Sequence, residues 1–97
     1  MTGKQRAYLR GLANSIDAKY QIGKDGVDDG IIRMIDLALE ANELIKIKVL
    51  ENAMLEVRET CNEVCERTGA QPVQCIGRKF VIYRESENNK TINIPSK

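Results

Sequence analysis

Between residues 28 and 68 the chain changes its hydrophobic period twice, from helical to extended and back again. In segments 28–42 and 54–68 apolar residues recur every three or four positions, as along one face of an α-helix. The segment from Leu44 to Leu50 alternates instead, with different residues on its two faces: Ile45, Ile47 and Val49 on one, Lys46 and Lys48 on the other. A strand between two helices predicts a domain of the α/β class.

Residues suited to cap or end a helix predict three helices. They run from an N-cap at Thr2 to near Asp17, from an N-cap at Asp28 to Asn42, and from about Met54 to Thr68, with Gly69 just beyond the end. The third helix carries one apolar stripe, made of Met54, Val57, Cys61, Val64, Cys65 and Thr68. We therefore expect both helical cysteines in the core.

The remaining strand-like segments are residues 19–22 and a hairpin, whose strands around 73–75 and 80–83 join at Gly77-Arg78. The predicted order is α-β-α-β-α-β-β, a compact single domain with a four-stranded mixed sheet and three helices. Strands separated by a helix favour parallel pairing, and the hairpin adds an antiparallel pair. From Ser86 to residue 97 the chain is polar, and we predict a loose tail.

The net charge of +1 conceals a segregated distribution. The chain has 97 residues, enough for one domain, with 15 basic and 14 acidic side chains. Residues 1–10 hold three basic and no acidic groups, and residues 76–97 hold five basic and two acidic ones. Residues 54–68 hold two basic groups against four acidic ones. The third helix is therefore acidic and both ends of the chain are basic.

Several classes of protein are disfavoured. No apolar stretch approaches the roughly 18 residues of a membrane span, and no secretory signal is visible.

Three cysteines, an odd number, argue against a secreted disulfide framework, so we expect a cytoplasmic protein with no membrane partner. Cys61, Cys65 and Cys75 could serve zinc or redox chemistry, but histidine is absent and C-x-x-x-C is an incomplete site. We expect no metal and no cofactor.

The sequence also disfavours catalysis. Without histidine the commonest general base is missing, and neither a P-loop nor G-x-G-x-x-G is present. The carboxylates lie on solvated helix faces. We expect no enzyme activity and no small-molecule substrate.

The segment Gly23-Lys24-Asp25-Gly26 lies between a predicted strand and a predicted helix. Glycines let a backbone approach a phosphate closely, and the amides and dipole of a helix N-terminus attract anions. A G-x-x-G loop clamps the nucleic-acid backbone in KH domains by this means. Glycines also bracket many ordinary turns, so a plain turn remains the alternative.

Motifs along nearly the whole chain resemble one family. They are Gly3-Lys4-Gln5, Leu9-Arg10-Gly11-Leu12-Ala13, Ile22-Gly23-Lys24-Asp25-Gly26-Val27, Leu44-Ile45-Lys46-Ile47-Lys48, Thr68-Gly69-Ala70, Val73-Gln74-Cys75-Ile76-Gly77, Val81-Ile82-Tyr83-Arg84, and Lys90 with Ile94-Pro95. In this order they resemble the YhbY-like proteins, which carry a single chloroplast RNA splicing and ribosome maturation (CRM) domain.

The resemblance implies a fold similar to the C-terminal domain of translation initiation factor three. It also implies a protein that binds RNA, since single-domain bacterial members associate with precursors of the large ribosomal subunit. The implied RNA-binding residues are the loop Gly23, Lys24, Asp25 and Gly26 and basic groups around it. The candidates for these basic groups are Lys4, Arg6, Arg10, Lys46, Lys48, Arg78, Lys79 and Arg84, with ordinary solvated surface as the alternative for each of them. Asp25 stands where the family commonly has Asn.

Two functions from different classes remain open. The first is binding of ribosomal RNA in a large-subunit precursor, mainly through backbone and shape, because the only aromatic residues are Tyr8, Tyr20, Phe80 and Tyr83. The second is a protein-interaction module whose acidic third helix docks a basic ribosomal partner.

Overall fold

The predicted order of elements is confirmed by a computed structural model that describes residues 1–95. The elements are α1 (Gly3–Ala13), β1 (Tyr20–Ile22), α2 (Asp29–Asn42), β2 (Leu44–Val49), the 3₁₀ turn η1 (Glu51–Ala53), α3 (Val57–Thr68), β3 (Gln71–Ile76) and β4 (Lys79–Tyr83). Among these residues no helix is both long and apolar enough to cross a membrane.

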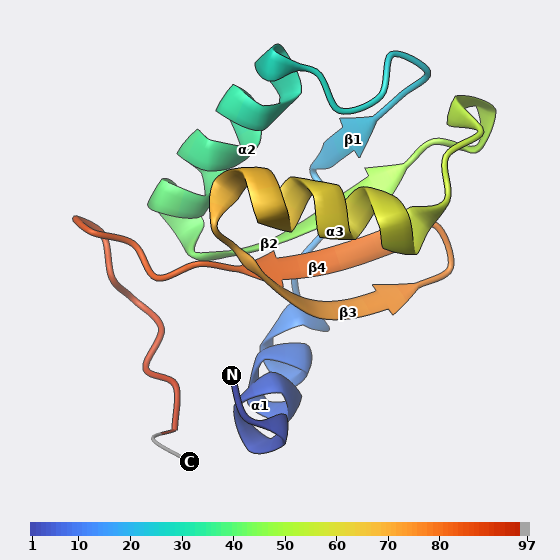
Figure 1. Cartoon of the computed structure of the whole chain (residues 1–97). Coiled ribbons are helices and arrows are strands. Elements are labelled where there is room, and N and C mark those ends of the chain that lie inside the picture. Colours follow the sequence, from blue (N-terminus) through green and yellow to red (C-terminus); the bar gives the residue numbers. More distant parts are fainter. Residues whose placement is uncertain (96–97) are drawn as a thin grey trace.

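The four strands form one mixed sheet in the order β1-β2-β4-β3 (Figure 1). β1 runs parallel to β2, while β4 is antiparallel to both β2 and β3. The predicted hairpin is therefore present, and its second strand lies in the middle of the sheet. The β3–β4 pairing shifts register between Pro72 and Gln74.

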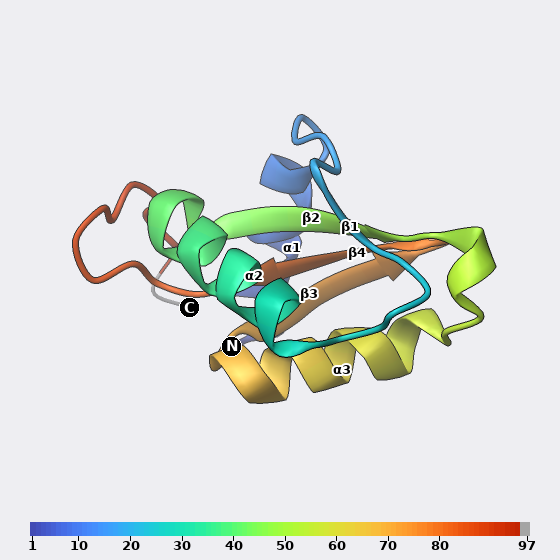
Figure 2. The same ribbon diagram turned by 90° about the horizontal axis from the view of Figure 1, so that it is seen from above.

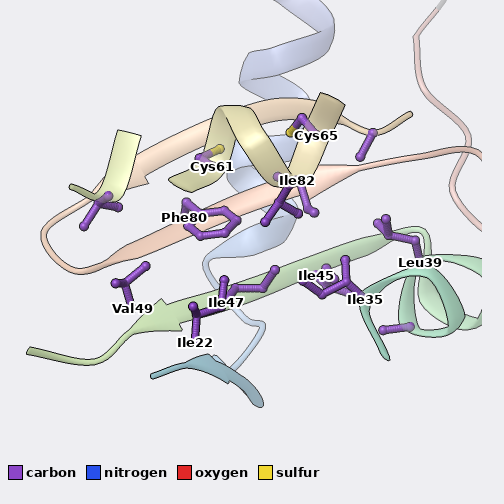
Figure 3. Packing of buried hydrophobic residues seen from close by; sticks show 14 of the residues in the cluster. Ile22, Ile35, Leu39, Ile45, Ile47, Val49, Cys61, Cys65, Phe80 and Ile82 are labelled. Atoms are coloured by element: carbon purple, nitrogen blue, oxygen red, sulfur yellow. The ribbon is translucent and has the colours of Figure 1, made fainter. Parts of the chain in front are cut away.

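Helices cover the two faces of the sheet unequally. α2 and α3 lie on one face, and α1 lies alone on the other (Figure 2). The main core lies under α2 and α3, where Phe80 and Ile82 of β4 pack among the inward residues of β2 and α2 (Figure 3). A second cluster lies under α1, with Leu9 and Ala13 against Val81 and Tyr83.

The cysteines confirm the expected packing. Cys61 and Cys65 are buried in the main core (Figure 3), and the half-buried Cys75 packs against this core. A hydrogen bond with Cys65, together with burial, raises the pKa of the Cys61 thiol. Burial likewise raises the pKa of Cys75 to about 11. These two side chains are therefore neutral thiols at physiological pH.

Two predicted helix boundaries are wrong. α3 begins at Val57 rather than near Met54, which has a left-handed φ of 56° and is 92% exposed. The Glu56 carboxylate caps the helix instead, because it accepts hydrogen bonds from the backbone N–H groups of Arg58 and Glu59. α1 ends at Ala13 and not near Asp17, although the caps predicted at Thr2, Asp28 and Gly69 are all present.

The prediction of a loose tail from Ser86 is wrong for residues 86–95, and residues 96–97 lie outside the described part. The carboxylate of the fully buried Glu43 holds this segment. Its oxygens accept hydrogen bonds from the backbone N–H groups of Ser86, Thr91 and Ile92, each at 2.8 Å. Ile92 then packs into the cluster under α1. The polar composition of residues 86–95 gives no sign of this attachment, because Glu43 lies more than 40 residues earlier in the sequence.

Replacing Glu43→Gln is expected to lower the free energy of unfolding by about 1–3 kcal/mol, because an amide NH₂ then faces a backbone N–H donor. Burial alone raises the pKa of Glu43, but the three backbone hydrogen bonds outweigh burial and hold the pKa below its ordinary 4.5. The contribution of Glu43 to stability is therefore complete above about pH 4.5 and is lost as pH falls through the folded-state pKa.

Denaturant titrations across this acidic range check the prediction. The parent should lose more stability on acidification than Glu43→Gln does, since Glu40 and Glu56, whose pKa values hydrogen bonds also lower, are present in both. Equal losses in the two proteins would contradict the role given to Glu43.

Candidate nucleic-acid interface

The segment Gly23–Gly26 forms a tight turn at the carboxyl end of β1 (Figure 1). The N–H of Gly26 donates a hydrogen bond to the carbonyl of Gly23 at 3.0 Å, and Lys24 and Asp25 lie exposed at the tip. Within residues 1–95 the backbone N–H groups of Lys24 and Asp25 have no acceptor. The tip therefore presents two free amides and one ammonium group to solvent.

The two glycines have different roles in the turn. Gly26 has a φ of +71°, which side-chain-bearing residues rarely adopt, yet a Cβ there would meet nothing within 4 Å. Gly23 lies outside the left-handed region, and a Cβ there would make an ordinary 3.6 Å contact with Leu50 Cδ1. The backbone of the turn therefore favours glycine, or a residue such as Asn that tolerates a left-handed φ, at position 26, and accepts alanine at position 23.

The turn leads directly into the N-terminus of α2, where two carboxylates are already engaged. Asp28 caps the helix, its Oδ1 accepting from the N–H of Ile31 at 2.8 Å. Asp29 pairs with Arg67 of α3 at 2.7 Å, and the other guanidinium NH₂ of Arg67 donates to the carbonyl of Val27 at 2.8 Å. Asp25 alone among the three nearby carboxylates forms neither a hydrogen bond nor an ion pair within residues 1–95.

Arg67 is the residue of this site that sequence reasoning missed. It belongs to the acidic third helix, and its closest sequence partner is Glu63, which lies 3.8 Å away at the i,i+4 spacing. Its bond to Val27 spans 40 residues. No local pattern signals such a contact.

Three of the predicted basic residues gather on one face of the sheet. Lys46 and Lys48 of β2 and Lys79 of β4 alternate with core residues and point to the face that carries α1. Lys48 is also the register partner of Gln21, two residues before Gly23. The structure therefore brings these lysines to the sheet beside the glycine turn.

The other predicted basic residues lie elsewhere. Lys4, Arg6 and Arg10 are on α1, and Nε of Arg6 donates to the carbonyl of Pro72 at 3.4 Å. Their predicted contact with RNA stays a prediction, and they form a group separate from the turn.

Arg78 and Arg84 are engaged within the protein. The guanidinium of Arg78 donates to three backbone carbonyls, those of Val49, Leu50 and Leu55, and so ties the β3–β4 turn to the segment after β2. Arg84 pairs with Asp36 and donates to the carbonyl of Thr68 at 2.8 Å. Both arginines have structural roles, and their contact with RNA stays a prediction.

Comparison with known proteins identifies relatives of the whole chain. Residues 1–84 match the model of the CRS1 / YhbY (CRM) domain. The probable RNA-binding protein YqeI of Bacillus subtilis is 41% identical over 95 residues, which cover 98% of this chain and 99% of that protein. An RNA-binding protein of Haemophilus influenzae is 35% identical over 97 residues, covering 100% of this chain and 97% of the relative.

A solved structure is also similar. The solution structure of the hypothetical protein SAV1595 from Staphylococcus aureus superposes with a TM-score of 0.78 and 43% sequence identity. The match covers 98% of this chain and 99% of the other.

Removing the Arg67 side chain is expected to loosen the glycine turn. Arg67→Ala loses the bonds to Val27 and Asp29, and we expect the free energy of unfolding to fall by about 1 kcal/mol, because Asp29 is 95% exposed and solvent screens the pair. Backbone ¹⁵N order parameters at residues 24–28 should fall as well. Arg58→Ala on the same helix is the control, since its side chain forms no ion pair within residues 1–95. Unchanged order parameters in Arg67→Ala would show that the turn stays ordered without the contacts of Arg67.

Proposed function

This chain belongs to the CRS1 / YhbY (CRM) domain family, and from that premise we propose that it binds RNA, without catalysis, through the turn Gly23–Gly26. The observation that carries the proposal is the geometry of the turn. Two free amides and the ammonium of Lys24 lie at the tip of the turn, in the segment that resembles the family's glycine loop. The names of the relatives as RNA-binding proteins support the same partner.

The chemistry suits a phosphate of the RNA backbone. The amides of Lys24 and Asp25 can donate to phosphate oxygens, and the ammonium of Lys24 can pair with the phosphate charge. Arg67 offsets the charge of Asp29 beside the helix start, and Asp28 is held as the cap. No aromatic side chain lies in the turn, so recognition depends on backbone and shape rather than on base stacking.

The more specific part of the proposal is the identity of the RNA. The family resemblance supports ribosomal RNA in precursors of the large subunit, and we propose that the protein acts in the cytoplasm during ribosome assembly. Crosslinking in cells, followed by sequencing of the attached RNA, tests this. Enrichment of large-subunit ribosomal RNA is the expected result. Recovery of other RNAs alone contradicts the ribosomal assignment, and recovery of no RNA contradicts RNA binding.

Binding of a basic protein by α3 is the alternative, because Glu59, Glu63 and Glu66 are exposed on the outer side of that helix. The two functions give opposite forecasts for Glu59→Gln/Glu66→Gln. RNA binding through the turn should persist in this variant, whereas capture of a basic ribosomal protein through α3 should be lost.

A side chain at position 26 is expected to weaken RNA binding without unfolding the domain. Asn tolerates a left-handed φ better than most residues, so Gly26→Asn should fold, while its side chain enters the open space before the turn. We expect affinity to fall about tenfold, the effect of losing one charged hydrogen bond. The matched control is Gly69→Asn, at a φ of +77° that is also open to solvent. Equal affinities in the two variants, measured by binding titration beside circular dichroism, would argue for a plain turn.

Removing the charge of Asp25 is expected to tighten binding. Asp25→Asn keeps a turn-competent side chain and removes a like charge beside the phosphate, for a gain of about two- to fivefold at low salt. The gain should shrink as salt rises, because exposed charges are screened over about 8 Å at physiological ionic strength. Glu66→Gln removes the same charge from the outer side of α3 and is the control. An equal gain in both variants means that only net charge matters.

A further inference from the structure

The face of the sheet that carries α1 is only partly covered. α1 packs against Val81 and Tyr83, toward the carboxyl end of β4, and no helix lies on this face near the carboxyl end of β2 (Figure 2). Strand register places one row of side chains across all four strands there, namely Gln21, Lys48, Lys79 and Ile76. With Lys46 and Gln74 in the next row, these residues form what we call the basic sheet face.

Two lysines of this face oppose each other directly. Lys48 of β2 and Lys79 of β4 are register partners on adjacent antiparallel strands, an arrangement that destabilises a sheet. Neither lysine forms an ion pair within residues 1–95, and their row neighbours, Gln21 and Ile76, are uncharged. The pair of lysines therefore does not stabilise the fold, whereas a bound anion would reduce the repulsion between the two ammonium groups.

The basic sheet face continues from the glycine turn. Gln21, the register partner of Lys48, is followed by Ile22 and then by Gly23 of the turn. α3, which carries the exposed Glu59, Glu63 and Glu66, lies on the opposite face of the sheet (Figure 2). A polyanion that contacts Lys24 can therefore extend across β2 and β4 without meeting the acidic helix.

The side chains of the basic sheet face suit a double-helical RNA better than unpaired bases. None of them is aromatic, so the face offers no stacking platform. Beside α1 it has a hollow of about 220 Å³, lined by Asn14, Lys46, Gln74, Ile76, Lys79 and Val81. The amides of Asn14 and Gln74 can bond ribose 2′-hydroxyls, the groups by which proteins read an RNA helix along with its phosphates.

We propose that the basic sheet face is a second RNA-contact surface, where Lys48 and Lys79 together bind the phosphates of a double-helical stem. This inference rests on the RNA binding of the proposed function, and it adds a second contact to that of the glycine turn.

The test compares Lys48→Gln/Lys79→Gln with a control of equal charge change, Arg33→Gln/Lys90→Gln, whose residues are exposed and lie off this face. The probe is an RNA hairpin with a double-stranded stem, titrated at several salt concentrations. We expect the lysine variant to bind at least tenfold more weakly and to lose about two units of salt slope, one for each phosphate contact. Without RNA at low salt, its melting temperature should rise, because the repulsion is gone. The control should change neither the slope nor the melting temperature to this extent.

Amide chemical-shift mapping with the same hairpin separates this inference from the proposed function. Shifts at residues 23–26 and at residues 21, 48, 76 and 79 support both. Shifts at the turn alone, with the lysine variant behaving like the control, overturn the second surface and leave the proposed function standing. Shifts at residues 21, 48, 76 and 79 alone contradict RNA binding through the glycine turn and support the second surface. An unpaired RNA of equal length that binds as well as the hairpin overturns the preference for a stem, and no shift at all overturns both proposals.

Discussion

The position of β4 in the middle of the sheet is the constraint on which the rest of the structure depends. It pairs with β2 on one side and β3 on the other, and its residues alternate between the two cores. Phe80 and Ile82 enter the core under α2 and α3, whereas Val81 and Tyr83 enter the cluster under α1. If β4 shifted by one residue against its neighbours, its residues would change faces, and each core would receive the side chains of the other. One strand register therefore determines the packing of the helices on both faces. The same register sets Lys79 opposite Lys48.

Much of the fold could be predicted because its signals are local. The caps at Thr2 and Asp28 and the left-handed Gly69 each act within a few residues, and the alternation around Ile47 needs only its neighbours. The prediction for Met54 is wrong because an apolar residue that is in phase with a helical stripe has the same pattern whether or not the helix includes it. Its left-handed backbone, with Glu56 as the true cap, is a choice between two local structures that periodicity cannot distinguish.

The candidate site likewise has one part that local sequence signals predict and another part that depends on distant contacts. The glycine turn could be located because strand, turn and helix are consecutive in the chain. The sequence could not sort the arginines, because their partners are distant: Arg67 reaches Val27 over 40 residues, and Arg84 reaches Asp36 over 48. A basic residue in a sequence looks the same whether it faces solvent or a backbone carbonyl. Only the tertiary arrangement gives Arg78 a structural role and leaves Lys48 and Lys79 unpaired within residues 1–95.

The buried carboxylate of Glu43 has a consequence for the order of events during synthesis. Its hydrogen-bond donors follow it by 43 to 49 residues, so they leave the ribosome long after it does. Until they arrive, burial would leave an uncompensated charge in the interior, and the junction of α2 and β2 has to remain hydrated. A nascent chain that stops short of Ser86 lacks all three donors, so this junction cannot close until the last strand and the segment after it have emerged.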